Sequence, residues 1–180
     1  MKYEYSIHGP FKIKTYKGAK HNKALDPDIE AKKKFWDDVE KKEANLPTAC
    51  GCYLFAIKTK GFKPWYVGLA GKGFQKECLA RHKIIIYTQV LNKYVSGTPI
   101  LFLIAKRTKE RGDFAKPSKN VRPDIKSLEN MLISAAIVKN RDLMNKKQTK
   151  YLREMRVPGL MHTLKKKPTD DEKQFKKKIK

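Results

Sequence analysis

Two short apolar runs lie close together in the first half of the chain, joined by a polar connection. The runs are "GCYLFAI" (51–57) and "PWYVGL" (64–69), and "KTKGFK" lies between them. Aromatic and β-branched residues favour strands, and a short polar connection that contains glycine is typical of a hairpin. This pattern predicts two antiparallel strands. A third apolar run, "TPILFLIAKR" (98–107), predicts another strand, and the proline near its start suits a first residue or an edge.

Helical patterns surround these strands. Residues 26–28 ("DPD") predict the start of a helix, and the apolar side chains at 35, 36 and 39 form its buried stripe. The segment 74–95 has the length of a helix, although its middle, "KIIIY", could also form a strand. The strongest helical pattern begins at Pro123 and ends at Asn140, with apolar residues 125, 128, 132 and 135 on one face.

These patterns divide the chain into three parts. Residues 1–47 form an N-terminal extension with a helix, and residues 48–145 form the folded core. Residues 146–180 form a basic extension with few apolar residues and long runs of like charge. Such composition is typical of disordered or loosely attached segments, so we expect this last part to be partly disordered.

The charge of the chain indicates a polyanionic partner. Its 180 residues include 42 Lys and Arg against 18 Asp and Glu, a net charge of +24. Nucleic acid is the first expectation, an anionic membrane surface the second, and a generally basic proteome the third. No apolar run approaches the roughly 20 residues of a membrane span, and the N-terminus lacks the apolar stretch of a secretory signal. We therefore expect a soluble, cytoplasmic protein with reduced cysteines and no membrane partner.

Two tripeptides in the paired strands resemble the motifs of the GIY-YIG nuclease family. They are Gly51-Cys52-Tyr53 in the first strand and Tyr66-Val67-Gly68 in the second. The resemblance implies an α+β fold in which a small three-stranded antiparallel sheet is flanked by helices. It also implies that Tyr53 and Tyr66 lie close together and line a catalytic surface. The alternative is that both tyrosines are ordinary core residues.

Glu129 matches the position of the family's metal-binding glutamate, on the helix after the third strand. Its helical neighbours include Ile125, Leu132 and Ile133, so its carboxylate lies at the edge of the buried face and needs a partner or a metal. The resemblance implies that Glu129 holds a divalent cation, Mg²⁺ or Mn²⁺. The alternative is an ion pair with a nearby lysine. The resemblance also implies a functional asparagine, with Asn145 preferred; an ordinary helix-ending residue is the alternative.

The chain departs from the family at its arginine, which typically lies about eight residues beyond the second glycine. Lys76 occupies that position, and the first arginine is Arg81. We expect Arg81 ahead of Lys76 to neutralise phosphate charge, because a guanidinium grips two oxygens at once. Three further side chains are within reach of such a site: Lys72, His82 and Lys83.

These residues predict phosphodiester hydrolysis. Tyr53 would take a proton from water if nearby cations lower its pKa, and His82 is the alternative base. Basic residues expected to contact phosphates are Lys72, Lys83, Lys106, Arg107, Lys109 and Arg111.

The predicted function is therefore a divalent-metal-dependent endonuclease acting on DNA, with RNA as a possible substrate. Two alternatives remain open. The first is a nucleic-acid-binding module with impaired catalysis, and the second is a basic structural or ribosome-associated protein.

Overall fold

The structure is a computed structural model that describes residues 3–17, 23–25, 28–94, 96–108, 112–120, 122–146, 149–154 and 167–179. Its centre is a four-stranded antiparallel sheet in the order β1-β6-β4-β5. The strands are β1 (Glu4–Lys12), β4 (Gly51–Lys58), β5 (Phe62–Ala70) and β6 (Thr98–Arg107). The predicted α+β class is confirmed, and β4, β5 and β6 correspond to the three predicted strands.

The predicted count of three strands is wrong, because β1 adds a fourth. It pairs with β6 along its length, from Glu4 opposite Arg107 to Lys12 opposite Ile100. This pairing leaves Phe11 buried in the core. The segment before residue 48 is therefore part of the sheet as well as the carrier of a helix.

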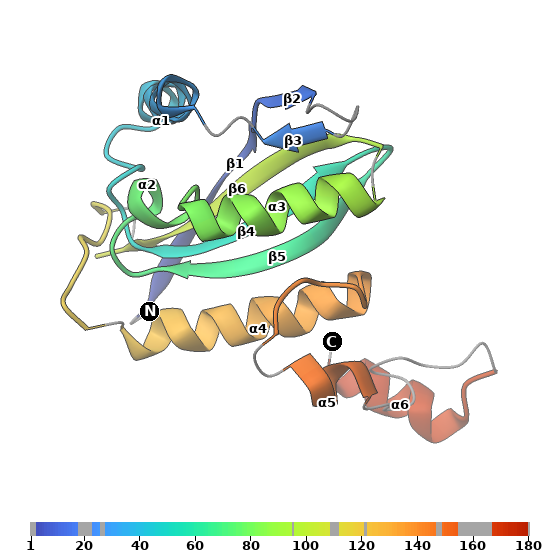
Figure 1. The fold of residues 1–180 in the computed structure, drawn as a ribbon. Helices are drawn as coiled ribbons and strands as arrows, with labels where there is room; N and C mark the ends of the chain where they lie inside the picture. The colour runs from blue at the N-terminus through green and yellow to red at the C-terminus, as the bar shows by residue number, and fades with distance from the viewer. Residues whose placement is uncertain are drawn as a thin grey trace.

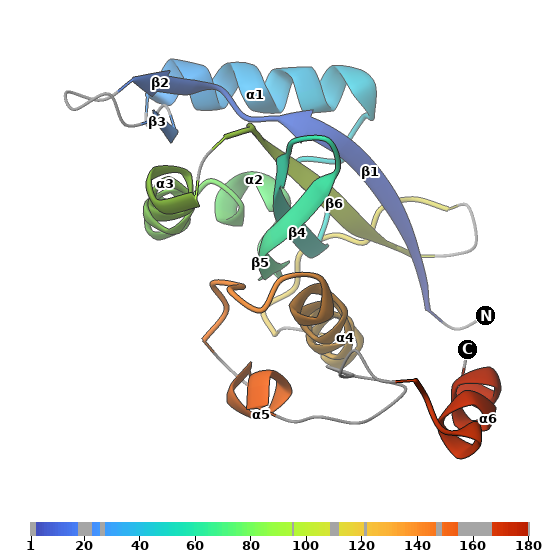
Figure 2. The ribbon, with the colours of Figure 1, turned by 90° about the vertical axis from the view of Figure 1, so that its right-hand side faces the viewer.

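Helices cover both faces of the sheet (Figures 1 and 2). One face lies under α1 (Ile29–Lys42), α2 (Phe74–Glu77) and α3 (Arg81–Tyr94). The opposite face packs against α4 (Pro123–Lys139), with α5 (Thr149–Glu154) beyond it. A short hairpin of β2 (Thr15–Lys17) and β3 (Lys23–Leu25) lies beside α3.

Side-chain alternation along β4 divides the core between the two faces. Tyr53 and Phe55 point toward α3, where the ring of Phe55 stacks on that of Tyr87 with 4.0 Å between centroids. Cys52 and Leu54 point the other way and pack against α4. The two faces of one strand thus belong to different helical layers.

Most of the predicted helices are present. In α1, Trp36 and Val39 are buried as expected and Asp28 is the N-cap, while residues 26 and 27 lie outside the described part of the chain. The segment "KIIIY" is helical and belongs to α3. The helix α4 ends with Asn140 as its C-cap.

Disorder is expected near the C-terminus, but residues 170–179 form a helix, α6 (Asp170–Ile179). Thr169 and Glu172 form a capping box: each side chain accepts a hydrogen bond from the other residue's backbone N–H, both at 3.2 Å. Acidic residues in the first turn and lysines in the last turn suit the helix dipole. Local capping therefore opposes the disorder that composition alone favours. None of the described helices is long and apolar enough to cross a membrane.

Candidate nuclease-like site

The glycine of each tripeptide is required by close packing. A Cβ at Gly51 would lie 2.0 Å from the carbonyl oxygen of Ile104 on β6. A Cβ at Gly68 would lie 2.2 Å from Cζ of Tyr53, because Tyr53 is paired with Gly68 across the hairpin and its ring covers that position. Each tripeptide therefore contains a tyrosine and a glycine, and the missing side chain of the glycine leaves room for a neighbouring strand or ring.

The hairpin brings the two tyrosine rings together, with 6.2 Å between their centroids. Tyr53 is fully buried, and its hydroxyl has no hydrogen-bond partner among the described residues. Burial raises the pKa of this hydroxyl far above its usual range. The nearby hydroxyl of Tyr87, which also contributes to the raised pKa of Tyr53, donates to the carbonyl oxygen of Cys78 at 3.0 Å. A buried phenol with a raised pKa is poorly suited to take a proton from water, so these surroundings argue against the base role expected of Tyr53.

Tyr66 is half-buried and is the member of the pair that meets a cation. The ammonium of Lys83 donates a hydrogen bond to the Tyr66 hydroxyl, and its nitrogen lies 4.5 Å from the centroid of the ring. Arg81 and Lys76, the expected cations, have exposed side chains. In the structure the charge beside the tyrosine pair therefore belongs to Lys83.

The remaining basic candidates in this region are exposed. His82 follows Arg81 at the start of α3 and points to solvent with it. Lys72 lies in the turn after β5, where its backbone N–H donates to the carboxylate of Glu77 at 2.7 Å. Both side chains are accessible to a charged ligand.

Glu129 lies on the opposite side of the sheet from the tyrosines. It is a half-buried residue of α4, the helix that packs on the face formed by Cys52 and Leu54 (Figure 2). Burial raises the pKa of the Cys52 thiol, and the negative charge of Glu129 is the next largest cause. The sheet therefore separates this carboxylate from the rings of Tyr53 and Tyr66.

Within the described residues, no three His, Cys, Asp or Glu side chains gather where they could hold a metal ion. Asp124, the other carboxylate near Cys52, accepts hydrogen bonds from Tyr5 and Lys106. Mg²⁺ keeps several waters and is commonly bound by one or two carboxylates together with substrate phosphates. One half-buried carboxylate, that of Glu129, is compatible with such a donor set.

Asn145 and Asn140 hold the free edge of β5. The backbone N–H of Val67 donates to Oδ1 of Asn145 at 2.9 Å, and Nδ2 of Asn145 donates to the Val67 carbonyl oxygen at 2.7 Å. Nδ2 of Asn140 donates to the carbonyl oxygen of Pro64 at 2.7 Å. These hydrogen bonds satisfy backbone groups at the edge of β5. The side-chain amides of Asn145 and Asn140 therefore have a structural role. Sequence reasoning missed this role, because nothing in the local pattern indicates a partner about 78 residues away.

Two of the residues expected to bind phosphate, Lys106 and Arg107, make contacts within the protein. Lys106 is buried, and its ammonium lies 2.5 Å from the Asp124 carboxylate. Arg107 donates to Oγ of Ser6 at 2.9 Å, and its guanidinium lies 4.0 Å from the ring centroid of Phe114. Burial against Asp124 takes the charge of Lys106 away from the surface, so this arrangement does not favour its expected contact with phosphate.

Arg107 is held by these contacts in the same way, and it also donates to the carbonyl oxygen of Gly112 at 3.0 Å. Because the guanidinium of Arg107 already contacts Ser6, Gly112 and Phe114, this arrangement does not favour its expected contact with phosphate. Lys109 and Arg111 lie outside the described residues.

Comparisons with models of protein families, with curated proteins and with solved structures found no match for this chain.

Proposed function

We propose that the protein binds DNA and hydrolyses its phosphodiester bonds with a divalent metal ion, in the manner of the GIY-YIG nucleases that its tripeptides resemble. The observation that carries this proposal is the contact between Lys83 and Tyr66 beside Tyr53. Aromatic hydroxyl and ammonium groups from three different elements are assembled there, next to exposed basic residues.

The proposal assigns different roles to the two tyrosines. Tyr66 and Lys83 contact the phosphate: the ammonium neutralises charge that develops on the nonbridging oxygens, and the phenol orients them by hydrogen bonding. Tyr53 supports Tyr66 from the core, because its ring packs against both Tyr66 and the backbone at Gly68. His82, exposed at the start of α3, is the candidate base for water.

Glu129 is the proposed protein ligand of the metal ion, Mg²⁺ or Mn²⁺. When bound, such an ion would polarise the phosphate and stabilise the leaving oxygen. Because Glu129 and Tyr66 lie on opposite faces of the sheet, this role requires the substrate to reach both residues around the edge strand β5. Water and substrate phosphate would complete its ligand set.

A second candidate is a nucleic-acid-binding module without turnover. It is favoured by the position of Glu129 on the helix across the sheet from the tyrosine pair. Under this alternative the same basic residues bind phosphate, and no hydrolysis follows.

A cleavage assay with supercoiled plasmid separates the candidates. We expect nicking in Mg²⁺ or Mn²⁺ and none in EDTA. Glu129→Gln keeps the shape of the side chain and removes its charge, so this variant should still bind DNA but cleave at least about a hundredfold more slowly, as expected when metal-assisted catalysis is lost.

Gel-shift measurements on the same samples complete the test. Binding without cleavage by the parent protein would support the module without turnover. Equal cleavage by the parent and Glu129→Gln would show that the metal is held elsewhere. Absence of both binding and cleavage would contradict the two candidates together.

A further inference from the structure

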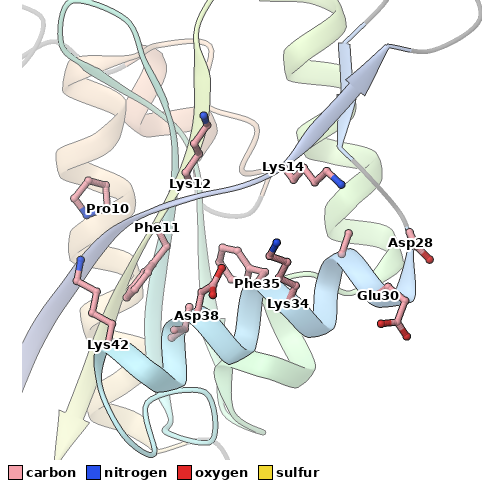
Figure 3. Close-up of a pocket in the computed structure, with 12 residues that line it drawn as sticks. Pro10, Phe11, Lys12, Lys14, Asp28, Glu30, Lys34, Phe35, Asp38 and Lys42 are labelled. Carbon is pink, nitrogen blue, oxygen red and sulfur yellow. The ribbon is translucent and has the colours of Figure 1, made fainter.

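A pocket of about 570 Å³ lies between α1 and β1, away from the tyrosine pair (Figure 3). Its apolar surface includes Pro10, Phe11 and Phe35. The rings of Phe11 and Phe35 meet edge to face with 6.4 Å between their centroids. The pocket has the volume and the aromatic lining typical of sites for small planar groups.

A second hollow of about 360 Å³ adjoins this pocket and shares Pro10 and Lys12 with it. Its other lining residues are Lys58, Thr59, Thr98 and Ile100. The two hollows therefore meet across β1, the edge strand of the sheet. Among the described residues that line the second hollow there is no carboxylate, so Lys12 and Lys58 make its lining positively charged.

An exposed aromatic residue extends this path. Phe62 has 52% of its surface exposed, and the ammonium of Lys58 lies 5.9 Å from the centroid of its ring. Its other neighbour is Phe102, whose ring meets it edge to face at 5.5 Å. A large exposed ring held in place beside a lysine is a suitable platform for stacking.

Charge is distributed unevenly along the first pocket. Asp28 and Glu30 lie at the N-terminal end of α1, whereas Lys42 lies at the other end, near Phe11, with one carboxylate, Asp38, beside them (Figure 3). The ammonium of Lys42 is 5.3 Å from the centroid of the Phe11 ring. At the end formed by Phe11, Lys12 and Lys42, two lysines outnumber the single carboxylate of Asp38, so an anionic ligand is favoured there. This end shares Pro10 and Lys12 with the second hollow.

We propose that these two hollows form a binding track for single-stranded nucleic acid. One unstacked base occupies the apolar pocket over Phe11 and Phe35, and a second stacks on Phe62. The backbone between them passes over Lys12 and Lys58. Alternating aromatic surface and basic side chains along a groove is how proteins bind single strands without reading their sequence. A duplex keeps its bases paired and cannot use the pocket in this way.

The test uses a fluorescein-labelled 12-residue oligothymidylate and fluorescence anisotropy in EDTA. Because EDTA prevents metal-dependent cleavage, the result is independent of the proposed nuclease activity. Lys12→Ala and Lys58→Ala should each weaken binding about fivefold at 0.1 M salt and reduce the slope of log affinity against log salt by about 0.7. Phe62→Ala should weaken binding at least about fivefold, through the loss of one stacked base.

Matched control variants come from the same chain. Lys33 and Lys41 are exposed on α1 but line neither hollow, so Lys33→Ala and Lys41→Ala remove the same charge elsewhere. Ile85, with 51% of its surface exposed on α3, provides the control for Phe62. The controls should bind almost as tightly as the parent, and thermal melting should show that every variant is folded.

Three results would overturn the proposal. The first is an equal loss of affinity in the track and control variants, which would indicate that the oligonucleotide binds to positive charge anywhere on the surface and not along the two hollows. The second is equal affinity for a duplex of the same length, with the same response to the track variants. The third is a loss of polyglutamate binding, but not of oligothymidylate binding, in those variants; this would assign the groove to acidic peptides.

Discussion

At the scale of single residues, the two tripeptides are explained first by packing. Gly51 allows the close approach of β6, and Gly68 leaves room for the ring of Tyr53. Only Tyr66 of the two tyrosines retains a partly accessible hydroxyl, and Lys83 binds it. The sequence therefore indicates that the two rings lie close together, whereas burial leaves only Tyr66 partly accessible from the surface.

The first prediction separates the two phenols. Tyr53→Phe removes a buried hydroxyl that lacks a partner among the described residues, so the free energy of unfolding should stay the same or rise by about 1 kcal/mol. DNA cleavage should persist in this variant. Tyr66→Phe should retain its stability and lose cleavage, because its hydroxyl contacts phosphate in the proposed site.

Urea denaturation and the plasmid assay measure both effects. A marked loss of stability in Tyr53→Phe would show that its hydroxyl is hydrogen-bonded in solution. Loss of cleavage with unchanged stability would restore Tyr53 to the base role expected from the sequence. Gly68→Ala is the packing control, and its clash with the Tyr53 ring should lower the free energy of unfolding by about 1–3 kcal/mol.

The choice among basic residues could not be made from the sequence. The predicted helix over 74–95 is interrupted at residues 78–80, between α2 and α3. Such a break changes the direction in which the later side chains point. The number of residues after Gly68 therefore does not predict which basic side chain lies beside the tyrosines. The structure places Lys83 on Tyr66 and leaves Arg81 exposed.

At the scale of elements, periodicity predicted individual strands and helices, but it did not predict pairing between strands that are far apart in the sequence. β6 spans Thr98–Arg107, the residues of the predicted strand, because its apolar run is continuous and its ends are polar. α4 was predictable because Pro123 and Asn140 mark its two ends. The pairing of β1 with β6 joins residues about 100 positions apart, and no local pattern specifies such a partner.

A buried polar cluster fastens α4 to the sheet and gives the second prediction. Asp124 lies 2.5 Å from the Lys106 ammonium and accepts a hydrogen bond from Tyr5 at 2.6 Å. Burial, the largest influence, raises the pKa of Asp124, but the hydrogen bonds from Lys106 and Tyr5 outweigh it, and the net shift is downward. The cluster thus joins β1, β6 and the first turn of α4.

A lowered carboxylate pKa stabilises the fold above the pKa of the unfolded state, near 3.9, and this contribution is lost as the pH falls through the folded-state value. Asp124→Asn should therefore lower the free energy of unfolding at pH 7 by about 3 kcal/mol, because Lys106 loses its buried partner. The difference from the parent should disappear in acid, well below pH 3.9. Urea denaturation across this range measures it, and a difference that does not change with pH would contradict the role of the charge.

At the scale of the whole molecule, the net charge of +24 favours binding through phosphate contacts. The C-terminal helix α6 carries three lysines in its last turn, and an ion pair between Lys173 and Asp170 lies within the helix itself. This region therefore contributes charge more than it contributes packing against the sheet.

The third prediction follows from this division. Removing residues 165–180 should leave the cooperative melting transition almost unchanged and weaken DNA binding, with a shallower dependence of log affinity on log salt. Differential scanning calorimetry and anisotropy titrations measure the two quantities. Loss of the cooperative transition would show that the C-terminal region stabilises the core.

The most direct test of the account is the rate of single-turnover plasmid cleavage in Mg²⁺ by two matched variants, Lys83→Gln and Arg81→Gln. Each removes one positive charge from the start of α3, two residues apart, so their effects on overall electrostatics are nearly equal. We predict that Lys83→Gln cleaves at least about a hundredfold more slowly than the parent, as when one donor to transition-state charge is lost. Arg81→Gln should cleave within a few-fold of the parent. Parent-like cleavage by Lys83→Gln, or a larger loss in Arg81→Gln, would contradict the assignment of the phosphate site to Tyr66 and Lys83.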